Sequence, residues 1–333
     1  MKFKIGFLFA LVLCPVAALA QVAPDAKVVF LKGTALMTAN ADGSNIQTLV
    51  NDGVSKSNPR WSPTGDKIVY EIGEETAAVE GVATTSITSL VVITAGGQLL
   101  QTMPQDTGGD WFFSVDEIGW YSGSAVFLTG AENRELKGYL ALDITSMKAI
   151  QDLEATTGED VGFETCPAGM QVAYPADARA YTSTPSVSVW VNGSTVYTAQ
   201  LPAQVPSGGI PFLLSDLRWS GDCSRLSFIE SNYASNTTTF VVLAGTSVEA
   251  RVPLPTSAGW PVTVVPVGSS FAILSGPEDQ YAGDTAALLY NTTTHTLDSA
   301  PSILQQLQQR EASEQQLMKT LGGESPDWYR SSQ

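Results

Sequence analysis

Short runs in which apolar and polar positions alternate recur between residues 27 and 300, and polar turns separate them. The stretch ALMTANADGSNIQTLV (35–50) holds two such runs around the turn NADGSN, and NPRWSPTGDKIVYEIG (58–73) holds two more around SPTGD. Alternation bounded by Gly, Pro, Asn and Asp is typical of β-strands joined in hairpins. The pattern therefore predicts a unit of four strands.

The layout of this unit recurs four more times, which indicates an internal repeat. An aromatic or aliphatic residue stands in the last strand of each copy: Tyr70, Phe127, Tyr174, Phe228 and Ile273. A period of roughly 45 to 57 residues with four strands per copy is typical of the blades of a β-propeller. We therefore expect an all-β fold.

The two ends of the array indicate how the ring closes. A lone strand, AKVVFLKG (26–33), precedes the first copy, and DTAALLYNTTTHTLDSA (284–300) follows the fifth as the first two strands of a sixth. Pairing of 26–33 with this incomplete last blade removes exposed sheet edges. The prediction is a six-bladed β-propeller over residues 26–300, closed by the N-terminal strand.

One helix is expected after the ring, over residues 301–323. Pro301 suits its first turn, Gly322 and Gly323 suit its end, and apolar residues recur at three-to-four spacing between them. Charged residues interrupt this stripe, which favours docking on the flank of the propeller over binding of a partner. Residues 324–333 are expected to form a flexible tail.

The motifs NADGSN and NPRWSPTGDKIVY resemble the propeller repeat of the TolB family, which also occurs beside the hydrolase domain of prolyl-oligopeptidase-type enzymes. The resemblance is closest in the first copy, whereas the fourth keeps only Trp219 and Ser220 of its Trp-Ser-Pro turn. It implies a stand-alone TolB-like propeller, because the sequence leaves no room for the N-terminal α/β domain of TolB proteins or for a hydrolase domain.

The first twenty residues are typical of a signal peptide. Lys2 and Lys4 precede an apolar run from Ile5 to Leu13, and Ala18-Leu19-Ala20 supplies a small-x-small cleavage site. We expect cleavage after Ala20 and a periplasmic or secreted mature chain. No later run is long and apolar enough for a transmembrane helix, so we expect no membrane insertion of the mature chain.

The charge excludes some partners. The chain has 17 Lys+Arg against 33 Asp+Glu and a net charge of −16, and losing Lys2 and Lys4 with the signal peptide makes it −18. Such a surface repels nucleic acid and anionic lipid. We expect a monomer that binds a protein or peptide.

The mature chain keeps two cysteines, Cys166 in ETCPAG and Cys223 in SGDCSR. Exported proteins retain disulfides, and both residues lie in the turn between the last two strands of their copies. Such turns share one face of a propeller, yet a bridge also requires Cα atoms about 4.4 to 6.8 Å apart. The sequence therefore does not decide whether Cys166 and Cys223 form a disulfide.

No catalytic, cofactor-binding or metal-binding residue is predicted. The single histidine, His295, is expected in a turn, and the sequence lacks the G-x-S-x-G motif of an α/β-hydrolase. Asp42 is assigned to turn formation rather than calcium binding, and Trp61, Trp120 and Trp219 are assigned to the core.

The function we predict is that of an exported, non-enzymatic scaffold that binds a protein or peptide in the cell envelope. The alternative is a carbohydrate-active enzyme that uses paired carboxylates at the mouth of the propeller. The acids considered for that role are Asp106, Asp110, Asp116, Glu117, Glu159, Asp160, Glu278 and Asp279.

Overall fold

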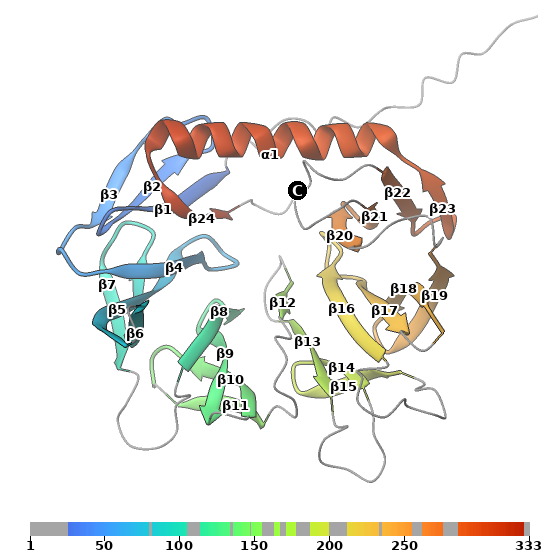
Figure 1. The fold of residues 1–333 in the computed structure, drawn as a ribbon, viewed down its shortest axis with the longest axis horizontal. Helices are drawn as coiled ribbons and strands as arrows, with labels where there is room; N and C mark the ends of the chain where they lie inside the picture. Colours follow the sequence, from blue (N-terminus) through green and yellow to red (C-terminus); the bar gives the residue numbers. More distant parts are fainter. Residues whose placement is uncertain are drawn as a thin grey trace, which may run out of the picture.

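The computed structural model describes residues 26–79, 82–104, 114–133, 136–146, 148–154, 163–166, 171–177, 187–199, 212–232, 235–254, 262–275 and 286–329. These residues form six four-stranded antiparallel sheets and one helix. The sheets stand around a common centre, with one strand of each sheet innermost (Figure 1). The fold is an all-β propeller, as predicted.

Each sheet is written here from its innermost to its outermost strand. Sheet 1 contains β24 (Glu324–Tyr329), β1 (Lys27–Lys32), β2 (Ala35–Asn40) and β3 (Gln47–Val50). Sheet 2 contains β4 (Lys56–Trp61), β5 (Lys67–Val79), β6 (Val82–Thr94) and β7 (Leu99–Pro104). Sheet 3 contains β8 (Ser114–Ser122), β9 (Ala125–Asn133), β10 (Leu136–Asp143) and β11 (Ala149–Glu154).

The remaining three sheets repeat this order. Sheet 4 contains β12 (Glu164–Thr165), β13 (Val172–Asp177), β14 (Val187–Val191) and β15 (Ser194–Thr198). Sheet 5 contains β16 (Phe212–Trp219), β17 (Leu226–Asn232), β18 (Thr237–Ala244) and β19 (Ser247–Pro253). Sheet 6 contains β20 (Val262–Val267), β21 (Ser270–Ser275), β22 (Ala286–Asn291) and β23 (Thr296–Ser299).

Apolar clusters between neighbouring sheets form the core. The residues that recur in the last strand of each sequence copy stand in the second strand of a sheet. Tyr70 packs between sheets 1 and 2, Phe127 between sheets 3 and 4, Phe228 between sheets 4 and 5, and Ile273 between sheets 5 and 6. The side chain of Tyr174 lies outside the described residues. Trp61, Trp120 and Trp219 are 7%, 2% and 5% exposed, which confirms their assignment to the core. A single sheet could not bury both of its faces, so each depends on its neighbours.

The predicted partner of the N-terminal strand was wrong. β1 pairs with β2 on one side and with β24 on the other, whereas β22, within residues 286–299, pairs with β21 and β23. Sheet 6 is thereby complete with four strands of its own and has no place for β1. The repeat in the sequence is offset from the sheets by two strands, so each sequence copy supplies the outer half of one sheet and the inner half of the next.

The assignment of residues 324–333 to a flexible tail was also wrong for most of that segment. Residues 324–329 form β24, the innermost strand of sheet 1. The sequence concealed it because Pro326 lacks a donor and Ser325 has a φ of +50°, so pairing with β1 breaks register there. The signal peptide and residues 330–333 lie outside the described residues.

Helix α1 (Pro301–Leu321) runs from the end of β23 to the start of β24 (Figure 1). Its first half packs on sheet 6 through Ile303, Leu304 and Leu307. Its second half packs on sheet 1 through Met318 and Leu321. The helix thus docks on the propeller and joins the last sheet to the first.

The end of the helix is shaped by two glycines. Gly322 has a φ of +63° and ends the helix in the left-handed conformation. A Cβ on Gly323 would lie 2.3 Å from a ring carbon of Phe30, so only glycine lets the chain pass this close to β1. The close approach places β24 against β1.

Candidate functional site

The innermost strands of sheets 2 and 5 carry the same motif at the same place. Arg60-Trp61 ends β4 and is followed by Ser62, and Arg218-Trp219 ends β16 and is followed by Ser220. In both strands a register shift precedes the arginine, and the residue in the shift has a positive φ: +47° for Asn58 and +51° for Asp216. Asparagine and aspartate tolerate this conformation better than most residues, so the sequence supports the bulge that positions each arginine.

Arg218 connects three sheets. Its Nε donates to the carbonyl oxygen of Val264 in sheet 6, at 3.2 Å, and its Nη1 lies 3.4 Å from a carboxylate oxygen of Glu164 in sheet 4. Asp216, within sheet 5, lies 3.8 Å from Nη2. The guanidinium therefore holds two carboxylates from neighbouring innermost strands in one ion-pair network, and about a third of the side chain remains exposed.

Arg60 has fewer contacts at the equivalent place. Within the described residues, its Nη1 donates a hydrogen bond to the carbonyl oxygen of Pro59, at 3.2 Å. Its charge also acts on Glu71, which is buried beside it on β5. Arg60 is partly exposed, and among the described residues only one hydrogen bond of its guanidinium is formed, which leaves further donors for a ligand.

Glu71 is a buried carboxylate, 1% exposed. Burial raises its pKa, and hydrogen bonds from Ser57 and Asn58 together with the charge of Arg60 oppose that shift only in part. Both hydrogen bonds reach Oε2, at 2.9 and 2.8 Å, and Oε1 has no hydrogen-bond partner among the described residues. Glu71 therefore places a buried carboxyl group on β5, next to the innermost strand of sheet 2.

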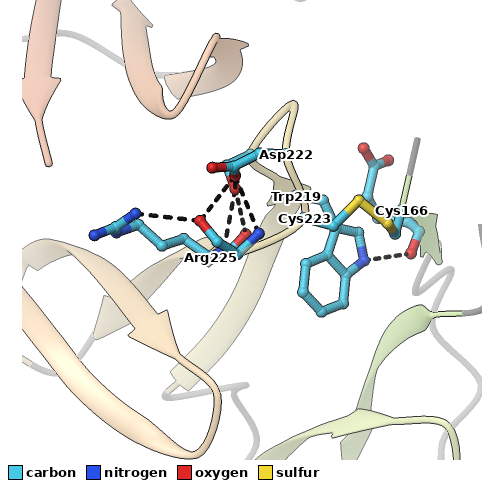
Figure 2. The surroundings of a disulfide bond; sticks show 8 residues. Cys166, Trp219, Asp222, Cys223 and Arg225 are labelled. Carbon is cyan, nitrogen blue, oxygen red and sulfur yellow. Dashed lines mark hydrogen bonds between the residues drawn. A yellow bond between two sulfur atoms is a disulfide. The ribbon is translucent and has the colours of Figure 1, made fainter. Parts of the chain in front are cut away.

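Cys166 and Cys223, whose pairing the sequence did not decide, form a disulfide in the structure. Cys166 and Cys223 are bridged, with their Cα atoms 5.7 Å apart (Figure 2). Cys166 follows β12 of sheet 4, and Cys223 lies in the turn between β16 and β17 of sheet 5. The bond therefore ties two consecutive sheets together next to their innermost strands.

The positions of the two cysteines are occupied by Ser62 and Gly65 in the equivalent turn of sheet 2. Aligning Glu164-Thr165-Cys166 with Arg60-Trp61-Ser62 places Cys166 at the position of Ser62. Cys223 takes the position of Gly65, and both donate a backbone hydrogen bond to the residue three earlier, at 2.8 and 2.9 Å. Gly65 has a φ of +66° and Cys223 a φ of +57°, so the cysteine adopts a conformation that normally favours glycine.

Around Cys223, the turn is held by Asp222. Its Oδ1 accepts hydrogen bonds from Ser220 Oγ and from the backbone and hydroxyl of Ser224 (Figure 2). The bond from Ser220 is the largest of the influences that lower the pKa of Asp222. These contacts hold the turn in which the disulfide is anchored.

Asp42 and His295 lie in turns, as predicted. Asp42 Oδ1 accepts a hydrogen bond from the backbone of Ser44, at 2.8 Å, which is an Asx turn. His295 lies between β22 and β23, its side chain is 54% exposed, and its Nδ1 is 3.0 Å from the hydroxyl of Tyr290. Among the described residues, no group of three or more His, Cys, Asp and Glu is placed to hold a metal ion.

The acids considered for glycoside hydrolysis are not tested by the structure. Asp106, Asp110, Glu159, Asp160, Glu278 and Asp279 lie outside the described residues, and of Asp116 and Glu117 only the backbone, in β8, is described. The residues that sequence reasoning missed are Arg60, Arg218, Glu164 and Asp216. The arginine before each Trp-Ser pair was the available signal, because a charged residue on an innermost strand is seldom needed for packing.

No protein-family model matches the sequence, and no curated protein matches it. Solved structures that are similar include the tricorn protease, with a TM-score of 0.50 and 10% identity over 81% of this chain and 29% of that one. TolB from Acinetobacter baumannii has a TM-score of 0.42 and 13% identity over 92% of this chain and 66% of that one. The propeller domain of the Trilobed protease from Pyrococcus furiosus has a TM-score of 0.46 and 11% identity over 82% of this chain and 80% of that one.

These likenesses concern the fold alone. The chain spans just under two thirds of TolB and less than a third of the tricorn protease, so the activities of those proteins do not carry over. With the six sheets, the likeness to the tricorn protease structure supports a β-propeller architecture. Within the part of the chain that the structure describes, no helix has the length and apolar character needed to cross a membrane.

Proposed function

We propose that the protein is an exported, non-enzymatic β-propeller that binds a protein or peptide partner of the cell envelope on its innermost strands. The observation that carries the proposal is Arg60, a partly exposed arginine with spare donors on the innermost strand of sheet 2. A guanidinium with free donors suits a carboxylate, which it can bind with two parallel hydrogen bonds. The partner segment therefore presents an aspartate, a glutamate or a chain terminus.

The surroundings of Arg60 fit a ligand of this kind. The chain as a whole is strongly acidic, with a net charge of −16, so a carboxylate is repelled from most of its surface. Arg218 is engaged by Glu164 and Asp216, whereas Arg60 is not paired in this way among the described residues. An acidic segment of the partner is therefore attracted to Arg60 on sheet 2 rather than to Arg218 on sheet 5.

Capture from an envelope extract tests this function. The tagged mature chain is compared with Arg60→Ala and with Lys148→Ala, which removes an equal charge from an exposed turn. We expect a captured protein whose affinity falls at least about tenfold in Arg60→Ala, because a charge-assisted hydrogen bond contributes roughly 1.5–3 kcal/mol, and is unchanged in Lys148→Ala. Equal capture by both variants, or glycan hydrolysis by the wild-type protein in a substrate screen, contradicts the proposal.

A further inference from the structure

A pocket of about 320 Å³ lies between sheets 4 and 5, next to the disulfide that joins them. Two of its lining residues, Trp219 and Cys223, appear in Figure 2, where the indole lies directly beside the bridge. Sheet 4 contributes residues around the turn between β14 and β15, and sheet 5 contributes the turns that follow β16 and β18. We propose that this pocket binds a neutral saccharide.

The inner wall of the pocket is apolar. Val191 and Val196 come from sheet 4, and Trp219 and Leu226 come from sheet 5. Trp219 is held in place by a hydrogen bond from its Nε1 to the carbonyl oxygen of Glu164, at 3.1 Å. Trp219 and Leu226 are 5% and 2% exposed, so they form the floor, and the partly exposed Val191 and Val196 supply the apolar contact for the C–H groups of a sugar ring.

The rim of the pocket is polar and uncharged. Its side chains are the amides of Gln171 and Asn192 and the hydroxyls of Ser224 and Thr246. Amides and hydroxyls both donate and accept hydrogen bonds, as sugar hydroxyls do. The hydroxyl of Ser224 is oriented, because it donates to Asp222 at 2.8 Å and accepts from Arg225 at 3.2 Å.

The absence of charge among the described lining residues favours a neutral ligand over an ionic one. The chain contains 33 acids and 17 basic residues, yet none of them is among the residues that line this pocket. A carboxylate, phosphate or ammonium would lose hydration on entering without gaining a charged partner. A purely apolar ligand, such as a peptide side chain, would instead cover the polar rim without satisfying it.

The size of the pocket limits the ligand. About 320 Å³ is near the lower end of the roughly 300–1,000 Å³ of small-molecule sites, so a mono- or disaccharide unit of a longer glycan fits. The disulfide fixes the two walls relative to each other, since Cys166 belongs to sheet 4 and Cys223 lines the pocket from sheet 5. The site is thus formed before the ligand arrives.

Saturation-transfer NMR and calorimetry on the oxidised mature chain test the proposal. The probes are glucose, galactose, mannose and N-acetylglucosamine, together with cellobiose, maltose and chitobiose. We expect at least one probe to bind with a dissociation constant on the order of 1 mM, since a dozen ligand atoms in a small site reach about that affinity.

Thr246→Val is the decisive variant, because it keeps the shape of an exposed side chain and removes one rim hydroxyl. We expect it to weaken binding about tenfold, the effect of one lost hydrogen bond, while Thr294→Val in the corresponding turn of sheet 6 leaves binding unchanged. Absence of saturable binding by every probe at about ten times that dissociation constant overturns the proposal, and so does equal binding by both variants. Binding of phenylalanine amide in place of the sugars would also overturn it and would assign the pocket to a peptide side chain.

Discussion

Removal of the Cys166–Cys223 disulfide should cost a predictable amount of stability. The bond closes a loop of 57 residues in sequence separation, and the chain-entropy relation gives about 4 kcal/mol for a loop of that length. A cysteine at a φ of +57° carries a conformational cost of about 1 kcal/mol. The two effects have opposite sign, so they can be separated by the choice of replacement.

Sheet 2 supplies the replacement residues. Cys166→Ser with Cys223→Gly introduces the residues that sheet 2 has at the equivalent places, Ser62 and Gly65. Ser62 shows that serine suits this turn, because its hydroxyl donates to Asp66 and accepts from the backbone of Lys67, both at 3.0 Å. This variant loses the constraint on the unfolded chain and gains relief of the left-handed conformation, so we expect a net loss of about 3 kcal/mol.

The alanine counterpart separates the two contributions. Cys166→Ser with Cys223→Ala keeps a Cβ in the left-handed conformation, so we expect it to lose about 4 kcal/mol, roughly 1 kcal/mol more than the glycine variant. Urea unfolding followed by circular dichroism measures all three proteins, and the wild type in a reductant serves as a control that should match the alanine variant. A loss below about 1 kcal/mol in both variants, or an alanine variant more stable than the glycine variant, would refute the reasoning.

Three further predictions concern the helix, the buried carboxylate and the closing glycine. Leu307→Ala should destabilise the protein by about 2–5 kcal/mol in urea unfolding, whereas exposed Gln309→Ala should change it by less than about 0.5 kcal/mol; equal effects would mean that the helix does not support the ring. Burial raises the pKa of Glu71 in the folded state, so the stability that this carboxyl group contributes is fully present below its ordinary pKa of 4.5 and is lost as pH rises through the raised pKa. Glu71→Gln should therefore gain stability relative to wild type between pH 4 and pH 7, and a pH-independent difference would contradict this. Gly323→Ala should loosen the C-terminal strand through its clash with Phe30, seen as faster proteolytic cleavage after residue 321, and unchanged cleavage would count against the close approach.

Much of the fold was predictable because the repeat carries its own signals. Turn residues such as Gly43 and Gly65 have positive φ, and among the described side chains Tyr70, Phe127, Phe228 and Ile273 are buried. β24 could not be predicted in the same way, because a serine followed by a proline is typical of an irregular segment and not of a strand. Its pairing depends on β1, almost the whole chain away, and local propensity holds no information about such a partner.

The candidate sites were less predictable than the fold. A single charged residue such as Arg60 leaves no periodic pattern, and its value as a binding group depends on which carboxylates neighbouring strands bring near. The disulfide was recognisable as a pair but not as a bond, because the distance between turns of adjacent sheets is set by packing. The pocket beside it arises only where two sheets meet, so no stretch of sequence encodes it.

The helix between the last sheet and the first has a consequence for how the protein is made. Sheets 1 and 6 each pack an apolar face on α1, and the described residues include no apolar cluster that joins the two sheets directly. While residues 301–329 are still being synthesised, both faces and the inner edge of β1 are open to other chains. Assembly of the ring is therefore a late event, and the interval before it is when the nascent protein most needs protection from aggregation.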